Sequence, residues 1–281
     1  MPAKQKYTAS DQGVVAKKHY GQHFLTDLEI AKKIADLIDA ETTDNLLEIG
    51  PGTGVLTQYL WDKSKRLILV ELDVESVLFL EQQFLPRLLK ENSKTIKILQ
   101  ADFLKLDLAP LFENAPFKLI GNFPYNISSQ IVFKMLEHRQ RVPQFCGMFQ
   151  KEVAERICAK HGSKVYGILS VLCQAYYHCD YKFSVSPSAF NPPPKVESGV
   201  INLTRKHQEI EGLPYLFFKR VVKTAFQQRR KTLRNALKPV IGNSNFEAST
   251  FLSLRAEQLS IEDFIELSHN LYLHLQPKSD Q

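Results

Sequence analysis

Short apolar runs alternate with amphipathic segments over the first two thirds of the chain. Five runs rich in Leu, Ile, Val and Phe predict buried strands at 45–49, 66–72, 95–100, 117–122 and 144–150. Segments with apolar residues at helical spacing predict helices at 27–37, 55–61, 74–84, 128–138 and 151–159. Repeated strand–helix units of this length are typical of a parallel sheet covered on both faces.

The pattern changes after Arg205. Two short runs, 181–185 and 199–204, flank a proline-rich loop and predict an antiparallel pair that closes the sheet. Beyond them, only helical runs follow, interrupted by Gly, Pro and Asn. We therefore expect an α/β domain over 1–205, with a loose polar extension at 1–20, and a small helical domain over 206–281.

Composition agrees with a folded chain that stays out of membranes. Of 281 residues, 44% are hydrophobic and 23% are charged, which is ordinary for a globular protein. No apolar run approaches the ~18 residues of a membrane-spanning helix, and the first residues lack the apolar core of a secretory signal. We therefore predict a cytoplasmic protein. Metal-ligand spacing is absent among the four cysteines, which predicts free thiols and no metal site; these are Cys146, Cys158, Cys173 and Cys179.

Positive charge is concentrated in one segment. Eight basic residues and no acid fall within 219–238, although the whole chain carries only +6. Such concentration indicates a polyanionic partner. A solvated helix face is the alternative interpretation of the same pattern.

A glycine-rich turn, EIGPGTG at 48–54, follows the first predicted strand. Gly50 and Gly52 permit a sharp turn and the close approach of a ligand. Glu71 ends the second strand, 21 residues after Gly50, where doubly wound folds place an acid for ribose hydroxyls. Asp102 follows the third strand and can accept a hydrogen bond from an adenine amino group. These strand ends predict one crevice that binds a nucleoside.

The spacing of the glycines and the acid before them favour a cationic nucleoside. Dinucleotide enzymes use GxGxxG with a helix N-terminus facing a pyrophosphate, whereas this turn reads GxGxG and follows Glu48. A carboxylate suits a positive ligand better than a diphosphate. S-adenosylmethionine carries a sulfonium and an ammonium group, so we predict it as the cofactor; NAD is the alternative.

The sequence GNFPYNI at 121–127 ends the fourth predicted strand and suits the presentation of an amine. An adenine amine is a poor nucleophile, because its lone pair is delocalised into the ring. Acceptors for both of its N–H groups would direct the lone pair at a methyl group. The Asn122 side chain and the Phe123 backbone carbonyl, held by Pro124, can serve as these acceptors, and Tyr125 can stack on the base. Catalysis would then be mainly positioning of a flipped-out base. A plain Asn-Pro turn is the alternative.

Together these motifs resemble the KsgA-type ribosomal RNA adenine dimethyltransferases over nearly the whole chain. The matching segments are KHYGQHFL (18–25), EIGPGTG (48–54), VELD (70–73), AD (101–102), GNFPYNIS (121–128), SKVYGILSVL (163–172), PSAFNPPPKVES (187–198) and FQQRRKTLRNAL (226–237). The resemblance implies a Rossmann-like class I methyltransferase domain with a helical RNA-binding domain. It also implies dimethylation at N6 of two adjacent adenosines near the 3′ end of small-subunit rRNA, with a role in subunit maturation.

The resemblance implies roles for individual residues as well. The donor pocket would be formed by His23, Leu25, Gly50, Glu71, Asp102 and Asn122. Phe190 would be a second aromatic clamp on the flipped adenine, or else a plain core residue. Two positions depart from the family: His23 replaces a usual Asn, and Phe123 replaces a usual Leu or Pro.

The basic segment would contact RNA. Its expected phosphate-binding residues are Arg229, Arg230, Lys231 and Arg234. Affinity should then fall steeply with salt. The expected partner is small-subunit rRNA within a pre-ribosomal particle, bound by a monomer.

Two other functions are compatible with part of the pattern. A large-subunit rRNA methyltransferase of the macrolide-resistance type would share the donor pocket, but the segments at 187–198 and 226–237 favour the small-subunit family. A non-catalytic RNA-binding assembly factor could retain the fold. The intact acids and the Asn122–Tyr125 corner argue against pure binding.

Overall fold

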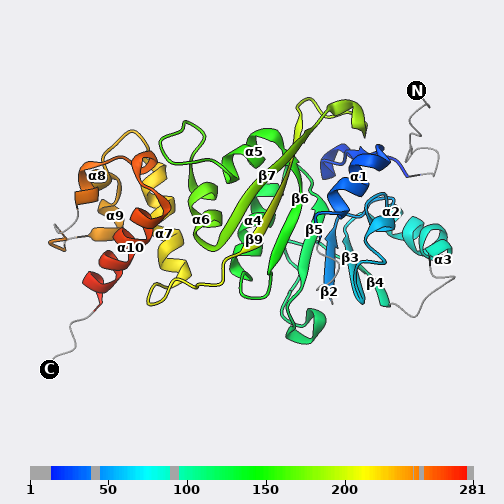
Figure 1. The fold of residues 1–281 in the computed structure, drawn as a ribbon, viewed down its shortest axis with the longest axis horizontal. Helices are drawn as coiled ribbons and strands as arrows, with labels where there is room; N and C mark the ends of the chain where they lie inside the picture. Colours follow the sequence, from blue (N-terminus) through cyan, green and yellow to red (C-terminus); the bar gives the residue numbers. More distant parts are fainter. Residues whose placement is uncertain (1–13, 39–44, 89–94, 243, 247–249, 277–281) are drawn as a thin grey trace. The chain divides into compact units, whose positions relative to one another are not determined.

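A seven-stranded sheet lies at the centre of the α/β part of the computed structural model, which describes residues 14–38, 45–88, 95–242, 244–246 and 250–276 (Figure 1). The strand order is β4-β3-β2-β5-β6-β9-β7. The strands are β2 (Asn45–Ile49), β3 (Arg66–Glu71), β4 (Thr95–Gln100), β5 (Lys118–Asn122), β6 (Gln144–Gln150), β7 (Tyr177–Val185) and β9 (Ser198–Arg205). The strands β4, β3, β2, β5 and β6 are parallel to one another, and β9 runs antiparallel to β6. The predicted strands and the α/β class are confirmed.

Burial explains the order of these strands. Every residue of β2 is buried, and so are five of the six residues of β3, whereas β4 at the edge has none buried. A continuous apolar run can be buried on both faces only in the middle of a covered sheet. The reversal in strand order between β2 and β5 therefore lies at the centre, where open α/β sheets bind ligands.

The helices of the α/β part begin and end at local sequence signals. They are α1 (Leu28–Ala35), α2 (Val74–Phe79), α3 (Leu85–Leu88), α4 (Ser128–Glu137) and α5 (Lys151–Ile157). The Asp27 side chain caps α1 by accepting hydrogen bonds from the N–H groups of Glu29 and Ile30. A π-helical turn joins α2 to α3, so the helix continues past the predicted end at 84.

One helix expected in this part is wrong. The helix predicted at 55–61 is only a 3-10 turn at Thr57–Tyr59. Its apolar spacing is accounted for by Val55, Leu56 and Leu60, which a series of turns places in the core. The extension at 1–20 was expected to be loose. Its first thirteen residues lie outside the described ranges, but Val14 is buried against Phe24 and Phe79.

Contacts divide the chain into two compact units, Met1–Ala154 with Asp180–Arg205, and Glu155–Cys179 with Lys206–Gln281. The second unit includes 155–179, which the sequence analysis put in the α/β domain. This segment contains α6 (Ile168–Tyr176), which packs on α7 (Tyr215–Gln227) and α10 (Ile261–Leu275). The aromatic ring of Tyr176 meets those of Tyr215 and Phe218 edge-on, at 6.0 and 6.3 Å between centroids.

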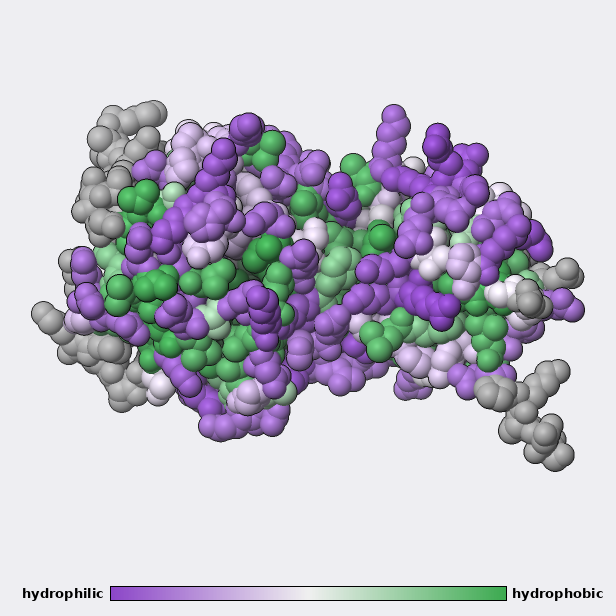
Figure 2. All heavy atoms as spheres, turned by 180° about the vertical axis from the view of Figure 1, so that it is seen from behind, coloured by the Kyte–Doolittle hydropathy of each residue, from purple (hydrophilic) through white to green (hydrophobic). Residues whose placement is uncertain are grey.

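The helical unit also contains two short helices, α8 (Leu233–Ala236) and α9 (Lys238–Ile241). Among the helical runs expected after Arg205 is the apolar segment NFEASTFLSL at 245–254. The structure has a 3-10 turn there at Thr250–Ser253, and 247–249 lie outside the described residues. Hydrophilic side chains cover much of this unit on the face drawn in Figure 2.

Two glycines leave space for the ring of Phe123 where β5 pairs with β6. Gly121 and Gly147 are paired across these strands. A Cβ at Gly147 would lie 2.1 Å from the Gly121 carbonyl oxygen and 2.6 Å from the Phe123 ring. The ring stacks on Phe145 at 5.0 Å with an interplanar angle of 4°. The bulky Phe at 123 is therefore accommodated by missing side chains on its neighbours.

We expect Gly147→Ala to destabilise the α/β unit by about 3 kcal/mol or more, because the new methyl group overlaps backbone that cannot move independently. Gly50→Ala is the control. Gly50 has φ +66°, but its Cβ would meet nothing closer than 4.0 Å, so only backbone strain of about 1 kcal/mol is expected. Denaturant unfolding measures both variants, and equal losses would contradict the packing argument.

Candidate functional site

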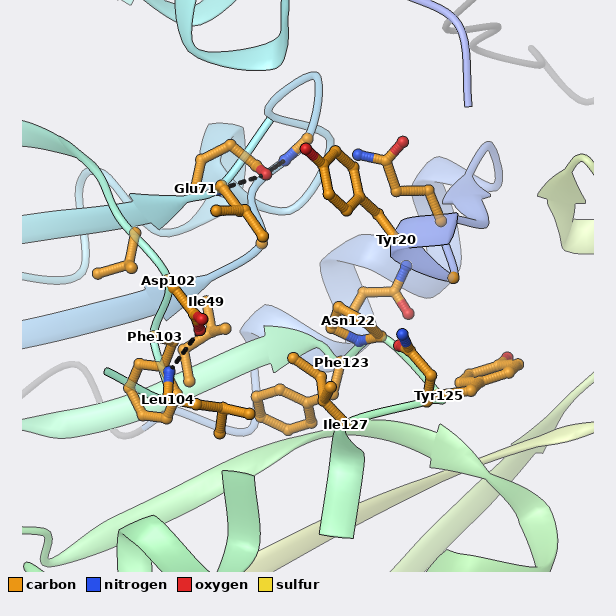
Figure 3. A pocket seen from close by; sticks show the side chains of 18 of the residues that line it. Tyr20, Ile49, Glu71, Asp102, Phe103, Leu104, Asn122, Phe123, Tyr125 and Ile127 are labelled. Carbon is orange, nitrogen blue, oxygen red and sulfur yellow. Dashed lines mark hydrogen bonds between the residues drawn. The ribbon is translucent and has the colours of Figure 1, made fainter. Parts of the chain in front are cut away.

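A cavity of about 270 Å³ opens at the carboxyl ends of the central strands (Figure 3). Gly50 and Gly52 follow β2, Glu71 ends β3, Asp102 follows β4, and Asn122 ends β5. The cavity is also lined by residues 19–24, which precede α1. The structure therefore brings together most of the predicted site residues, from distant parts of the sequence, because parallel strands end at one edge.

The Glu71 carboxylate fixes the glycine turn. Its Oε2 atom accepts a hydrogen bond from the Gly52 N–H at 3.0 Å, and its Oε1 atom accepts from the N–H groups of Leu72 and Asp73 at 2.8 and 2.9 Å. Burial raises the pKa of Glu71, and these three donors oppose the shift. The carboxylate thus joins β3 to the turn after β2 on the wall of the cavity.

The Asp102 carboxylate is more open. Its Oδ1 atom accepts a hydrogen bond from the Leu104 N–H at 2.9 Å (Figure 3). Its Oδ2 atom lies 3.6 Å from the Lys105 ammonium, and the side chain is 31% exposed. An oriented, partly exposed carboxylate beside apolar Phe103 and Leu104 can accept a hydrogen bond from a purine amino group.

The Asn122 amide has a defined orientation. Its Nδ2 group donates to the backbone carbonyl of His23 at 3.0 Å. Only the NH₂ half of the amide can donate, so Oδ1 is the half that can accept from a ligand. The Phe123 N–H donates to the Met148 carbonyl at 3.1 Å, which ties the following residue to β6.

Tyr125 is held on two sides. Its hydroxyl lies 2.5 Å from Ser198 Oγ, and its ring stacks with that of His23 at 5.4 Å and 30°. The His23 Nδ1 atom lies 2.8 Å from the carbonyl oxygen of Pro192. Burial raises the pKa of Tyr125, so its hydroxyl is neutral at physiological pH. The Asn122–Tyr125 corner is therefore a fixed, neutral surface that presents an acceptor and a ring.

The segment before α1 contributes more than sequence reasoning predicted. Tyr20 and Gln22 line the cavity but were not predicted as site residues. Gly21 between them has φ +66°, and a Cβ there would lie 2.7 Å from Asn126 Oδ1. The available signal was the resemblance of the whole stretch 18–25 to a family motif, rather than any single residue.

An ion pair fastens this segment to the start of α2, directly after β3. The Lys17 ammonium lies 2.5 Å from Asp73 Oδ1 and 3.1 Å from Glu75. The Lys17 N–H donates to Gln22 Oε1 at 2.7 Å. Burial alone would raise the pKa of Asp73, but hydrogen bonds from Lys17, Ser76 and Gln22 hold it below its ordinary value. Asp73 is thus ionised and paired at neutral pH.

Three predicted residues do not line the cavity. Glu48 is buried beneath the turn, where it accepts a hydrogen bond from the Thr57 hydroxyl at 2.7 Å. Burial raises the pKa of Glu48 to about 8, so its protonated, uncharged form is favoured at neutral pH. Leu25 and Phe190 are paired in a two-stranded sheet, β1 (Phe24–Leu25) with β8 (Phe190–Asn191), and both side chains belong to the core.

The predicted RNA-contacting residues differ in their exposure. Arg230, Lys231 and Arg234 are exposed on the helical unit. Arg229 is instead engaged within that unit, because its guanidinium donates to the carbonyls of Lys164 and Ser163 at 2.7 and 3.1 Å. It supports the loop before α6 rather than extending into solvent.

Metal sites, thiols and membrane-spanning helices bear on the remaining predictions from the sequence. Among the residues that the structure describes, no cluster of His, Cys, Asp or Glu is arranged to hold a metal ion. Cys146, Cys158, Cys173 and Cys179 form no disulfide bonds with one another. In the same described part of the chain, every helix is too short or too polar to cross a bilayer.

The fold and the position of the cavity are those of a class I methyltransferase that uses S-adenosylmethionine. A solved dimethyladenosine transferase from Plasmodium falciparum has a TM-score of 0.70 and 25% identity, covering 89% of this chain and 96% of its own. The 23S rRNA methyltransferase ErmE shares the fold, with a TM-score of 0.62, 23% identity and coverage of 86% and 98%.

Sequence comparison defines the family. A family model described as ribosomal RNA adenine dimethylase matches residues 13–273, and the chain belongs to this family. It is 55% identical to ribosomal RNA small subunit methyltransferase A of Flavobacterium johnsoniae, over 92% of this chain and 96% of the relative. It is 50% identical to the protein of the same name from Phocaeicola vulgatus, over 95% and 93%.

We expect Glu48→Gln to change how stability depends on pH. The pKa of Glu48 is about 8 in the folded chain, against an ordinary 4.5, so folding takes up a proton between these values. The contribution of Glu48 to the free energy of unfolding is complete below pH 4.5. It is lost as the pH rises towards 8, by up to about 1.4 kcal/mol per pH unit. The variant keeps the hydrogen bond without the charge. Its melting temperature should therefore exceed that of the wild type increasingly between pH 5 and 8.5.

The exposed Glu81 supplies the matched control, Glu81→Gln, whose melting curve should follow the wild type across this range. Parallel pH profiles for Glu48→Gln and the wild type would refute the buried, neutral state of Glu48.

Proposed function

We propose that the chain transfers methyl groups from S-adenosylmethionine to N6 of two adjacent adenosines near the 3′ end of small-subunit rRNA. The observation that carries the proposal is the Asn122 amide, whose orientation is set by its hydrogen bond to the His23 carbonyl at 3.0 Å. It stands beside Tyr125 at the cavity that Glu71 and Asp102 also line.

The donor site has groups that suit each part of the nucleoside. The Asp102 carboxylate accepts from the adenine amino group, and the Glu71 carboxylate, whose inner lone pairs are taken by backbone N–H groups, accepts from the ribose hydroxyls. The glycine turn lets backbone approach the ligand closely. S-adenosylmethionine, when bound, supplies an electrophilic methyl group on sulfur.

The Asn122–Tyr125 corner activates and holds the acceptor. Asn122 Oδ1 accepts one N–H of the target amine, and the Phe123 carbonyl accepts the other. With S-adenosylmethionine bound, these bonds would direct the nitrogen lone pair toward its methyl group. The Tyr125 ring stacks on the base, which has left its helix at a cost of a few kcal/mol. Glu48 is not assigned a contact with either substrate, because it lies below the turn and does not line the cavity.

The proposed substrate is rRNA within a small-subunit precursor, and we extend the proposal to a cytoplasmic monomer that also acts in subunit maturation. The helical unit would contact RNA through the exposed Arg230, Lys231 and Arg234. The relatives named small subunit methyltransferase A support this target over the large subunit.

One experiment tests the substrate directly. Purified protein is incubated with isotopically labelled S-adenosylmethionine and with small or large ribosomal subunits that lack adenosine dimethylation, and the modified nucleotides are mapped. We expect two adjacent dimethyladenosines in the small subunit. Label in the large subunit would favour the macrolide-resistance type, and no label in either would favour the non-catalytic factor.

We expect Asn122→Ala to lower the rate of methyl transfer at least about a hundredfold, as loss of one preorganised hydrogen-bonding group does in other enzymes. Calorimetric affinity for S-adenosylhomocysteine should change little. Gln130→Ala, which removes an exposed amide from α4, should leave the rate unchanged. Near-normal turnover by Asn122→Ala would contradict its role in presenting the amine.

We expect the double variant Arg230→Ala, Lys231→Ala to flatten the salt dependence of rRNA binding, reducing the slope of log K against log salt by about 1 to 2. Arg229→Ala is the comparison. Its guanidinium is bound to carbonyls within the unit, so the change should lower thermal stability more than it changes the slope. An unaltered slope in the double variant would contradict the proposed RNA contact.

A further inference from the structure

Lys134 on α4 places its ammonium at the centre of three backbone carbonyls. It donates to the oxygens of Phe103 and Leu104 at 2.7 and 3.0 Å, and to that of Leu106. It also lies 5.2 Å from the centroid of the Phe103 ring. An ammonium has three N–H donors, so Lys134 spends its full donor capacity on one short turn.

This turn is the one that carries Asp102. The Asp102 side chain accepts from the Leu104 N–H at 2.9 Å, and its backbone carbonyl accepts from the N–H groups of Lys105 and Leu106 at 3.0 and 2.9 Å. The N–H groups of the turn are therefore held by Asp102, and its carbonyls are held by Lys134. The position of the Asp102 carboxylate therefore depends on both sets of hydrogen bonds.

The helix that carries Lys134 is an extension of the Asn122–Tyr125 corner. The Ile127 N–H donates to the Pro124 carbonyl at 3.2 Å, and the Ser128 hydroxyl, at the start of α4, donates to the Tyr125 carbonyl at 3.1 Å. One helix thus connects the corner that would present the target base with the turn that would bind the donor adenine.

We propose that Lys134 is a positioning residue that sets the Asp102 carboxylate for the adenine amino group of the donor, in register with the base-presenting corner. The proposal rests on the donor site described under the proposed function. Loss of the ammonium leaves three carbonyls without their shared donor, so the turn shifts and Asp102 no longer meets the amino group in a fixed direction. The loss of affinity should therefore come from the contact with the adenine end of the donor.

Lys105 offers a matched comparison on the same turn. Its side chain is 87% exposed, and its ammonium lies 3.6 Å from Asp102 Oδ2. A lysine that acted merely by general charge near Asp102 would be as important at 105 as at 134. Because Lys134 instead binds three backbone carbonyls of the turn, we expect the substitution at 134, and not the one at 105, to change the ligand preference.

The test compares two ligands by calorimetry, S-adenosylhomocysteine and S-inosylhomocysteine, which has an oxygen in place of the amino group. The wild type should prefer the amino ligand. Lys134→Met should lower affinity for S-adenosylhomocysteine roughly tenfold, as expected for a lost hydrogen bond to a charged group, and should change affinity for S-inosylhomocysteine much less. Lys105→Met should keep the wild-type preference.

Each other outcome is decisive. Equal losses for both ligands in Lys134→Met show a merely structural lysine and overturn the proposal, as does an unchanged preference. A wild type that does not distinguish the ligands, or binds neither, refutes the donor site itself, which is a failure of the proposed function.

Two additions cover a variant that fails to fold. Lys134→Gln retains a polar side chain but cannot supply three donors, and it should also lose the preference. In hydrogen-exchange measurements on the folded proteins, the amides of Leu104, Lys105 and Leu106 should exchange faster in Lys134→Gln than in the wild type. Unchanged exchange would overturn the proposal independently of ligand binding.

Discussion

The hydrogen bond from the Asn122 amide to the His23 carbonyl connects two segments that are 99 residues apart in the sequence. It has two consequences. The amide is turned so that its oxygen is the group left to accept from a ligand, and the segment before α1 becomes a wall of the cavity. That wall is kept in place by the Lys17–Asp73 pair at 2.5 Å. The site therefore depends on an N-terminal segment as much as on the sheet.

The parts predictable from sequence are those that local pattern determines. Buried strands ending in glycine, acid or Asn-Phe-Pro-Tyr predicted the sheet and the edge at which the site forms, because parallel strands place their carboxyl ends together. Gly50, Glu71, Asp102 and Asn122 line the cavity for that reason. Their roles in binding and transfer stay predictions.

The parts not predictable depend on burial and on partners distant in sequence. A motif shows that Glu48 precedes the glycine turn, but not that its side chain lies beneath the turn with its pKa raised to about 8. Arg229 and Arg230 are adjacent and alike in sequence, but Arg229 binds the carbonyls of 163 and 164 and lies 3.5 Å from Glu257, whereas Arg230 is exposed. In the sequence, the segment 155–179 continues the α/β pattern. Its place in the helical unit is shown only by the packing of α6 on α7 and α10.

A crystal structure with bound S-adenosylhomocysteine would show whether the cavity holds the donor in the orientation that transfer to a base at Asn122 requires. We expect the adenine amino group within hydrogen-bond distance of Asp102, the ribose hydroxyls at Glu71, and the sulfur directed toward the space in front of Asn122 Oδ1. Electron density for the ligand outside this cavity, or with its sulfur directed away from Asn122, would contradict this expectation.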